Sequence, residues 1–216
     1  MNKLHHFGDS YANTGFNDVH FVKLLSKNNG YLYQGVNTIK AGSSNELMLN
    51  NLLYRIFEIE DGDMLFFNFS FFVRGCYYDF EKREVRSTNS FYCDGPNESR
   101  TISECNQYIR DIITYQLDCN EDYNRRLFHQ IDTIFEQLHK RNIVVNYIFN
   151  EETPWCDDLL KYGNKIKFDG GFVKWLYSMD YHKEEECHYS RGVQELIYDE
   201  VIKQIVFPKK STLSIL

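Results

Sequence analysis

A chain of 216 residues is long enough for one well-buried α/β domain and short for two. Its 43% hydrophobic and 25% charged residues are ordinary for a globular protein and exclude an intrinsically disordered chain. The formal net charge of -7, with Lys and Arg scattered along the chain, argues against a basic surface for nucleic acid.

The first third of the chain alternates predicted strands with predicted helices. Apolar residues at helical spacing follow Val19, and residues 43–46 (Ser-Ser-Asn-Glu) offer an N-cap hydroxyl and an early acid for a second helix. A continuous apolar run over residues 64–69 is typical of a strand buried in a parallel sheet. We therefore predict a strand over 3–7, a helix over 19–28, a strand over 31–39, a helix over 43–57 and a strand over 64–69.

Residues 71–97 differ from this pattern, because polar and aromatic residues alternate and Gly75, Gly95 and Pro96 interrupt them. We predict a hairpin or a long loop that leaves one end of the sheet. Beyond it we predict helices over 101–117 and 122–141, a strand over 142–149, a short helix over 154–162, a strand over 165–168 and a final helix over 190–205.

Strands that alternate with helices imply a parallel sheet covered on both faces and joined by right-handed crossovers. The order of elements predicts a single domain over residues 1–216. We expect a flavodoxin-like, three-layer α/β/α sandwich around a parallel sheet of about five strands. Such sheets place their functional sites at the carboxyl ends of the strands.

The amino terminus lacks the apolar stretch of a signal peptide, and polar residues interrupt the longest apolar run, residues 64–73. A membrane span needs about 20 apolar residues, so we expect a cytoplasmic protein with no membrane partner. The six cysteines contain no CxxC pair and are expected to be free thiols. Cys and His residues do not stand at the spacing of zinc ligands, so we expect no metal site.

A first candidate for chemistry is Gly8-Asp9-Ser10, directly after the first predicted strand. This position places the Ser10 hydroxyl at the carboxyl end of a strand, where the backbone N–H groups of a following helix attract an anion. Three residues are a weak motif, and Ser10 as a simple helix N-cap is the alternative interpretation.

A second candidate is Glu185-Glu186-Cys187-His188, immediately before the final predicted helix. A carboxylate three residues before a histidine can fold back to the ring, fix its tautomer and stabilise the imidazolium. In the alternative interpretation the glutamates interact favourably with the positive amino end of the helix dipole, and His188 lies on the surface. Ser10 in the first βα turn and His188 before the last helix can meet at one end of a doubly wound sheet.

Together these segments resemble blocks of the SGNH hydrolases, also called GDSL lipases and esterases. The first block is matched by residues 7–12 (FGDSYA), the second by residues 41–44 (AGSS), and the last by residues 185–188 with Tyr189, Ser190 and Gly192 following. The chain departs from the family in having Glu185 where an aspartate is usual. In the third block, normally Gly-x-Asn, Phe66 stands where glycine is expected before Asn68. Gly15-Phe16-Asn17-Asp18 matches that string, but it falls just after Ser10 and is interpreted as a coincidence.

The resemblance implies a Ser10–His188–Glu185 triad without a metal or an organic cofactor. It implies an oxyanion hole made by the backbone N–H groups of Ser10 and Gly42 and the side-chain amide of Asn68. Ser70 is the rival donor if the third strand ends further along the chain than residue 69. We assign substrate-binding roles to Asp9, Tyr11, Arg74 and Trp155.

The activity that the resemblance implies is ester hydrolysis, with an O-acetyl group on a carbohydrate, or another small ester, as the substrate. A binding or structural protein that kept the fold and lost turnover is one alternative, because the third block is defective. An O-acyltransferase that uses the same triad is another. Of the remaining histidines, we expect His5 and His6 to pack in the first strand, and His20, His129 and His139 to lie on the surface.

Overall fold

The computed structural model describes residues 1–8, 20–35, 44–72, 76–79, 84–87, 111, 120–152, 159–179 and 191–209. Within these residues, five parallel strands form one sheet in the order β2-β1-β3-β6-β7. The strands are β1 (Lys3–Gly8), β2 (Leu32–Gln34), β3 (Met64–Phe69), β6 (Val144–Phe149) and β7 (Asn164–Lys165). This strand order is that of a flavodoxin-like fold.

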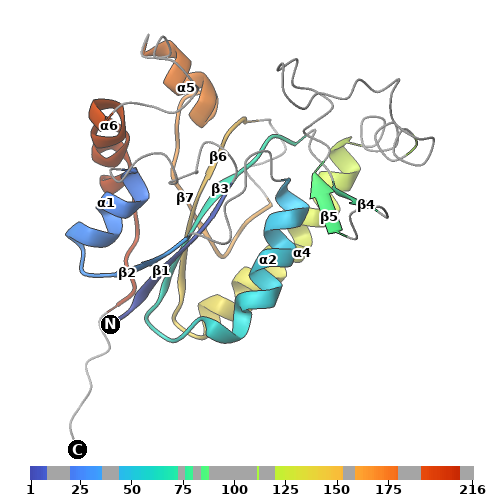
Figure 1. The fold of residues 1–216 in the computed structure, drawn as a ribbon, viewed down its shortest axis with the longest axis horizontal. Helices are drawn as coiled ribbons and strands as arrows, with labels where there is room; N and C mark the ends of the chain where they lie inside the picture. Colours follow the sequence, from blue (N-terminus) through green and yellow to red (C-terminus); the bar gives the residue numbers. More distant parts are fainter. Residues whose placement is uncertain are drawn as a thin grey trace, which may run out of the picture.

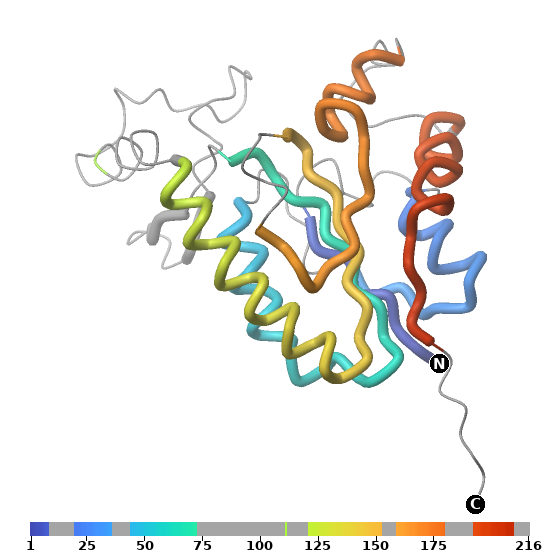
Figure 2. Tube along the Cα trace, turned by 180° about the vertical axis from the view of Figure 1, so that it is seen from behind, coloured from blue at the N-terminus to red at the C-terminus, as the bar shows by residue number. Residues whose placement is uncertain are grey.

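Helices cover both faces of the sheet, as Figures 1 and 2 show. On one face lie α1 (Phe21–Asn28), α5 (Phe172–Ser178) and α6 (Arg191–Ile202), and on the other lie α2 (Asn45–Arg55) and α4 (Asn120–Lys140). Each face has its own hydrophobic cluster of buried side chains from the sheet and its helices. The predicted three-layer α/β/α sandwich with about five strands is confirmed.

The central strand β3 shows why a continuous apolar run forms this sheet. Its side chains alternate between the two clusters: Leu65, Phe67 and Phe69 face α2 and α4, whereas Met64 and Phe66 face α1, α5 and α6. The ring of Phe67 stacks on that of Phe7 with centroids 4.7 Å apart. Aromatic pairs of this kind add about 0.5–1.5 kcal/mol each beyond the apolar area that they bury.

Helix α2 begins where its sequence predicts. The Ser44 hydroxyl accepts the backbone N–H of Leu47 at 3.2 Å, and Glu46 lies in the first turn. The helix ends at Arg55 and continues as the 3-10 turn η2 (Ile56–Glu58). Gly62, with a φ of 89°, then allows the tight turn that leads into β3.

Several predicted elements differ in extent from the observed ones. β2 has three residues, and residues 159–162, the described part of the predicted helix over 154–162, are not helical. Helix α5 was not predicted, because its seven residues are too few for a clear period and follow Gly170 and Gly171. The predicted helix over 101–117 lies outside the described residues except for residue 111. Within the range 71–97, β4 (Cys76–Asp79) and β5 (Glu84–Ser87) pair antiparallel in a separate two-stranded sheet.

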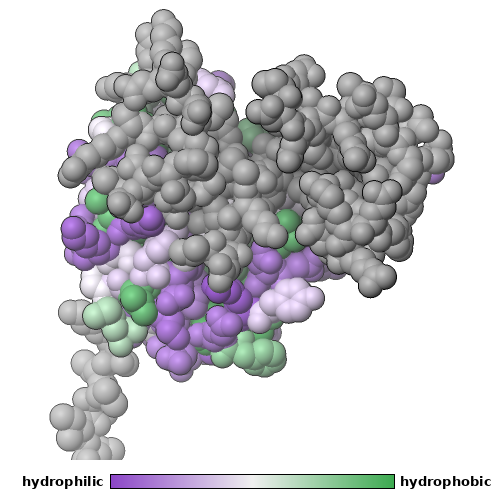
Figure 3. Space-filling model, in the orientation of Figure 1, coloured by the Kyte–Doolittle hydropathy of each residue, from purple (hydrophilic) through white to green (hydrophobic). Residues whose placement is uncertain are grey.

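The surface carries both polar and apolar residues. On the face shown in Figure 3, the described residues are mostly hydrophilic and the hydrophobic ones form separate patches. The most exposed large apolar side chains within the described ranges include Tyr54 and Phe57, at 86% and 95% exposure. No helix in the described part of the chain is long and apolar enough to cross a membrane.

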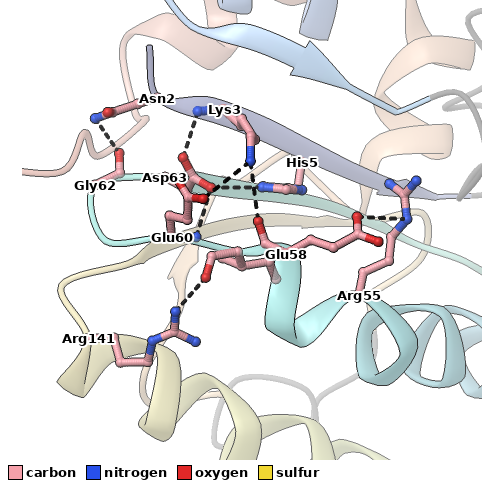
Figure 4. A network of polar contacts seen from close by, with 10 residues as sticks. Asn2, Lys3, His5, Arg55, Glu58, Glu60, Gly62, Asp63 and Arg141 are labelled. Atoms are coloured by element: carbon pink, nitrogen blue, oxygen red, sulfur yellow. Dashed lines mark hydrogen bonds and ion pairs between the residues drawn. The ribbon is translucent and has the colours of Figure 1, made fainter.

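Asp63 ties the amino ends of β1 and β3 together (Figure 4). Its carboxylate accepts the backbone N–H groups of Lys3 at 2.7 Å and Glu60 at 3.0 Å. It also lies 3.0 Å from Nε2 of the buried His5. Because a carboxylate only accepts, Nε2 of His5 carries the proton in this bond. Burial lowers the pKa of His5, although the hydrogen bond to Asp63 opposes that shift.

We expect Asp63→Ala to lower the free energy of unfolding by about 3 kcal/mol, because three donors lose their buried acceptor. The matched control is Glu60→Ala. Glu60 is 76% exposed and lies 3.8 Å from the Lys3 ammonium, so its loss should cost less than about 1 kcal/mol. Urea unfolding of the two variants measures both values, and equal losses would contradict the anchoring role of Asp63.

Candidate functional site

The sheet has a switch point between β1 and β3. From β1 the chain passes through α1 to β2 on one side, and from β2 it crosses through α2 to β3 on the other. Connections that leave in opposite directions open a crevice at the carboxyl ends of the two strands, where ligands bind in open α/β sheets. Gly8 and Asn68 are the paired residues at this end.

Most of the predicted site residues lie outside the described residues, and Asn68 is the one that lies within them. The residues outside are Asp9, Ser10, Tyr11, Gly42, Arg74, Trp155, Glu185 and His188. The chain segments that lead to several of them are described. Gly8 precedes Ser10 by two residues, Ser44 follows Gly42 by two, and Arg191 follows His188 by three.

Asn68 lies within β3, one residue before the strand ends, and is fully buried. In the sheet it stands between Gly8 of β1 and Ile148 of β6. Strand alternation directs its side chain to the face of Met64 and Phe66, which α1 and α6 cover. Because β3 extends past Asn68, Ser70 is the first residue after the strand. The strand ends at Phe69, as predicted, so the condition under which Ser70 would rival Asn68 as a donor is not met.

The residue that stands at the family's glycine position is part of the core. The Phe66 ring is fully buried, with its centroid 5.6 Å from the Phe21 ring and 5.9 Å from the His6 ring. At this position the Phe66 side chain of β3 packs against α1 through Phe21.

A buried pair of histidines lies beneath the carboxyl end of β1. His6 precedes Gly8 by two residues, and its Nδ1 lies 3.0 Å from the Tyr33 hydroxyl of β2. Its ring centroid is 5.5 Å from that of His20. The prediction that His20 lies on the surface is wrong: His20 is buried as the N-cap of α1, and its Nδ1 accepts the N–H of Val22 at 3.2 Å. The sequence offers a weak signal for this, since His20 directly precedes the apolar helical pattern.

The electrostatics of this pair keep His6 neutral. Burial lowers the pKa of His6 well below its usual value, and the neighbouring His20 ring lowers it further. Since Nδ1 of His20 accepts a hydrogen bond, a neutral His20 ring carries its proton on Nε2. The uncharged His6 ring can therefore pack against Phe66 at the base of the switch point, and the His20 ring lies against Phe21.

Helices from the first and the last part of the chain, α1 and α6, meet beside this pair. The Oε1 atom of Gln194, in the first turn of α6, accepts the backbone N–H of Phe21, the first residue of α1, at 3.0 Å. The bond is buried, and α1 and α6 lie side by side in Figures 1 and 2. The amino end of α6 is thus held next to the amino end of α1, at the carboxyl edge of the sheet.

Side chains that the sequence analysis missed gather around the exit of β3, residues 70–72. Asn45 of α2 bonds to Ser70, while Asn124 of α4 and Glu151 after β6 bond to Phe72. Asparagines in helices, such as Asn45 and Asn124, and a glutamate just after a strand, such as Glu151, carry no sequence signal for such long-range bonds. Within the described ranges, no three His, Cys, Asp or Glu side chains are grouped to hold a metal ion.

No family model and no curated protein matches the chain. Among solved structures, it is similar to TesA with a TM-score of 0.48 and 11% identity, over 94% of this chain and 97% of that one. It is similar to the psychrotrophic esterase EstA from Pseudoalteromonas sp., with a TM-score of 0.44 and 11% identity over 94% and 96% of the two chains. For the lipase/acylhydrolase from Enterococcus faecalis, the TM-score is 0.40 and the identity 14%, over 98% and 100%.

The buried His6 predicts a loss of stability in acid. Its pKa is lowered in the folded state, so below about pH 6.5 the unfolded chain binds a proton that the folded chain excludes. Each such group lowers the free energy of unfolding by up to about 1.4 kcal/mol per pH unit. We expect His6→Gln to lose less stability than wild type between pH 7 and pH 5, while His5, whose pKa is also lowered, acts in the same direction in both proteins.

Urea unfolding midpoints at several pH values measure this slope. His129→Gln, at an exposed position on α4, is the matched control and should follow the wild-type profile. A His6→Gln profile as steep as that of wild type would refute the assignment of the acid sensitivity to His6.

Proposed function

We propose that this chain is a serine ester hydrolase of the SGNH kind, with Ser10 as nucleophile, His188 as its base and Glu185 as the acid that orients His188. The observation that carries the proposal is the Gln194–Phe21 hydrogen bond. It holds the start of α6 beside the start of α1, and this supports a meeting of His188, which precedes α6, with Ser10, which follows β1.

Chain connectivity supports this meeting. Two residues span at most about 7 Å, so Ser10 lies within that distance of Gly8 at the switch point. Three residues span at most about 11 Å, which limits the distance of His188 from Arg191 at the start of α6. Both limits agree with a serine and a histidine that share one crevice.

The proposed reaction has two steps. His188 takes the Ser10 proton while Oγ attacks the ester carbonyl carbon, and the imidazolium returns that proton to the departing alcohol. Water then loses a proton to His188 and attacks the acyl-enzyme, and Ser10 leaves as a hydroxyl when the acid is released. Each step passes through an oxyanion, for which we propose the N–H groups of Ser10 and Gly42 and the Asn68 amide as donors.

The position of Asn68 supports its role, because it pairs with Gly8 at the carboxyl ends of the two strands that flank the switch point. It is also fully buried, and a hydrogen bond to a developing charge is worth more away from water. Ser70, one residue beyond the strand, is the competing donor.

For the substrate we propose a small ester, with an O-acetyl group on a carbohydrate first. Asp9, Tyr11, Arg74 and Trp155 are the side chains proposed to bind it, with the Trp155 ring available to stack on a sugar. No metal or organic cofactor is part of the mechanism. A sugar hydroxyl in place of water would make the same triad an O-acyltransferase.

The proposal is tested with wild type, Ser10→Ala and His188→Ala, using p-nitrophenyl acetate and a fluorophosphonate probe. We expect labelling and turnover in wild type, with kcat reduced at least about 1000-fold in either variant. A wild type that neither labels nor turns over would make the fold a binding scaffold. Turnover that rises with an acceptor sugar, with the acyl group found on that sugar, would indicate the transferase.

The oxyanion donor is tested by Asn68→Ala against Ser70→Ala. Loss of one donor lowers kcat about 100- to 1000-fold and changes KM little. We expect this loss for Asn68→Ala and less than about a fivefold effect for Ser70→Ala. The reverse result would assign the role to Ser70.

A further inference from the structure

The exit of β3, residues 70–72, is held by side chains from three other elements. Four of the bonds that hold it use the backbone N–H and C=O of Ser70 and the backbone N–H and C=O of Phe72. Ser70 and Phe72 are both buried. The path of the chain directly after β3 is therefore set by hydrogen bonds from α2, from α4 and from Glu151, just after β6.

Asn45 makes two of these bonds. Its Oδ1 accepts the Ser70 N–H at 2.7 Å, and its Nδ2 donates to the Ser70 C=O at 3.2 Å. The side-chain amide thus pairs with Ser70 as a neighbouring strand would. Asn45 is itself fully buried and is the first residue of α2, directly after the N-cap Ser44.

The other two bonds hold Phe72. Glu151, just beyond β6, accepts the Phe72 N–H at 2.5 Å through Oε1. The buried Asn124 of α4 donates from Nδ2 to the Phe72 C=O at 2.9 Å. These bonds fix the far end of the exit, so a loss at Asn45 would release mainly the end next to Asn68.

A purely structural explanation exists for such bonds, because buried backbone groups must be satisfied. The chain contains an example at Asn146 of β6, also fully buried. Asn146 bonds to both backbone groups of Val206. Its Nδ2 donates to the Val206 C=O, and its Oδ1 accepts the Val206 N–H, each at 2.9 Å. That bond pair anchors the segment after α6 to the middle of the sheet, away from the exits of β1 and β3 (Figure 1).

The location of Asn45 distinguishes it from Asn146. Asn45 follows Gly42 by three residues, and its partner Ser70 follows Asn68 by two. We propose that Asn45 is a positioning residue that fixes the exit of β3 at Ser70 and thereby holds the nearby Asn68, the proposed side-chain donor of the oxyanion hole, in place. This inference rests on the proposed esterase function and adds to it a residue outside the triad and the donors.

The physical basis is preorganisation. Oxyanion donors act because they already point to the place where charge develops. A displacement of about 1 Å in such a group can lower the rate about 100-fold even when the substituted residue is remote from the reacting atoms. The bonds of Asn45 are not made to the substrate, so their loss should lower kcat and leave KM nearly unchanged.

The experiment compares Asn45→Ala with Asn146→Ala, because each removes one buried amide that pairs with both backbone groups of a single residue. Asn146 also accepts a hydrogen bond from Nδ2 of Asn164 at 2.9 Å, so the control removes one more bond. Melting temperature, kcat and KM for p-nitrophenyl acetate are measured at a temperature where both variants are folded. We expect the melting temperature to fall in both, and at least as much in Asn146→Ala as in Asn45→Ala. We expect kcat to fall about 10- to 100-fold in Asn45→Ala, with KM within about twofold, and to stay within about twofold of wild type in Asn146→Ala.

Asn45→Asp provides the second variant if Asn45→Ala does not fold. It keeps an oxygen for the Ser70 N–H but has no N–H for the Ser70 C=O. We expect kcat between wild type and the alanine variant, and a proportionally slower reaction of Ser10 with the fluorophosphonate probe.

Two results would overturn the inference: a kcat within twofold of wild type in the folded Asn45 variants, or an equal loss of kcat in Asn146→Ala. Either result leaves the proposed function standing if wild type labels and turns over. A wild type that neither labels nor turns over overturns the proposed function and, with it, the role of Asn45.

Discussion

The pairing of β1 with β3 is the constraint on which the rest of this structure depends. Five residue pairs, from Leu4–Met64 to Gly8–Asn68, place the two strands in register at the centre of the sheet. At the amino end, Asp63 binds the Lys3 backbone and the buried His5 ring. At the carboxyl end the chain leaves in opposite directions, which creates the switch point. A register shift of one residue would turn every side chain of β3 to the wrong face and would separate Gly8 from Asn68.

The aromatic core makes that pairing rigid. Phe7, Phe67 and Phe69 form a row of stacked rings on the face of α2 and α4, with Phe135 and Phe128 packed against them. Close-packed rings leave little room for the strands to shift. Where the chain leaves regular structure, buried side-chain amides bind its backbone groups. Asn45 and Asn124 do so at the exit of β3, and Asn146 does so at the segment after α6. The same core that stabilises the sheet therefore also determines where its exits lie, and the exits bear the proposed chemistry.

Local patterns predicted the elements that have a strong period or a continuous apolar run. β3 was predicted with its observed bounds, and the N-cap of α2 lies within the predicted start. Elements too short to show a period were missed or overextended, as α5 and β2 show. His20 was assigned to the surface because its sequence neighbours say nothing of β1, whose His6 lies against it. For the candidate site, sequence blocks supplied Ser10, His188 and Asn68, whereas Asn45, Asn124 and Glu151 could not be found, because their partners lie 25 to 79 residues away.

By itself the sequence determined the class of the fold and the order of its elements, and it offered candidate residues for chemistry, because these follow from local periodicity and from short motifs. Only the tertiary structure decided which strand ends adjoin, which face each buried polar side chain takes, and which amides hold the exit of β3. Those features depend on contacts between residues far apart in the chain, and their energies come from packing and from hydrogen bonds that form only when the sheet and its helices are assembled.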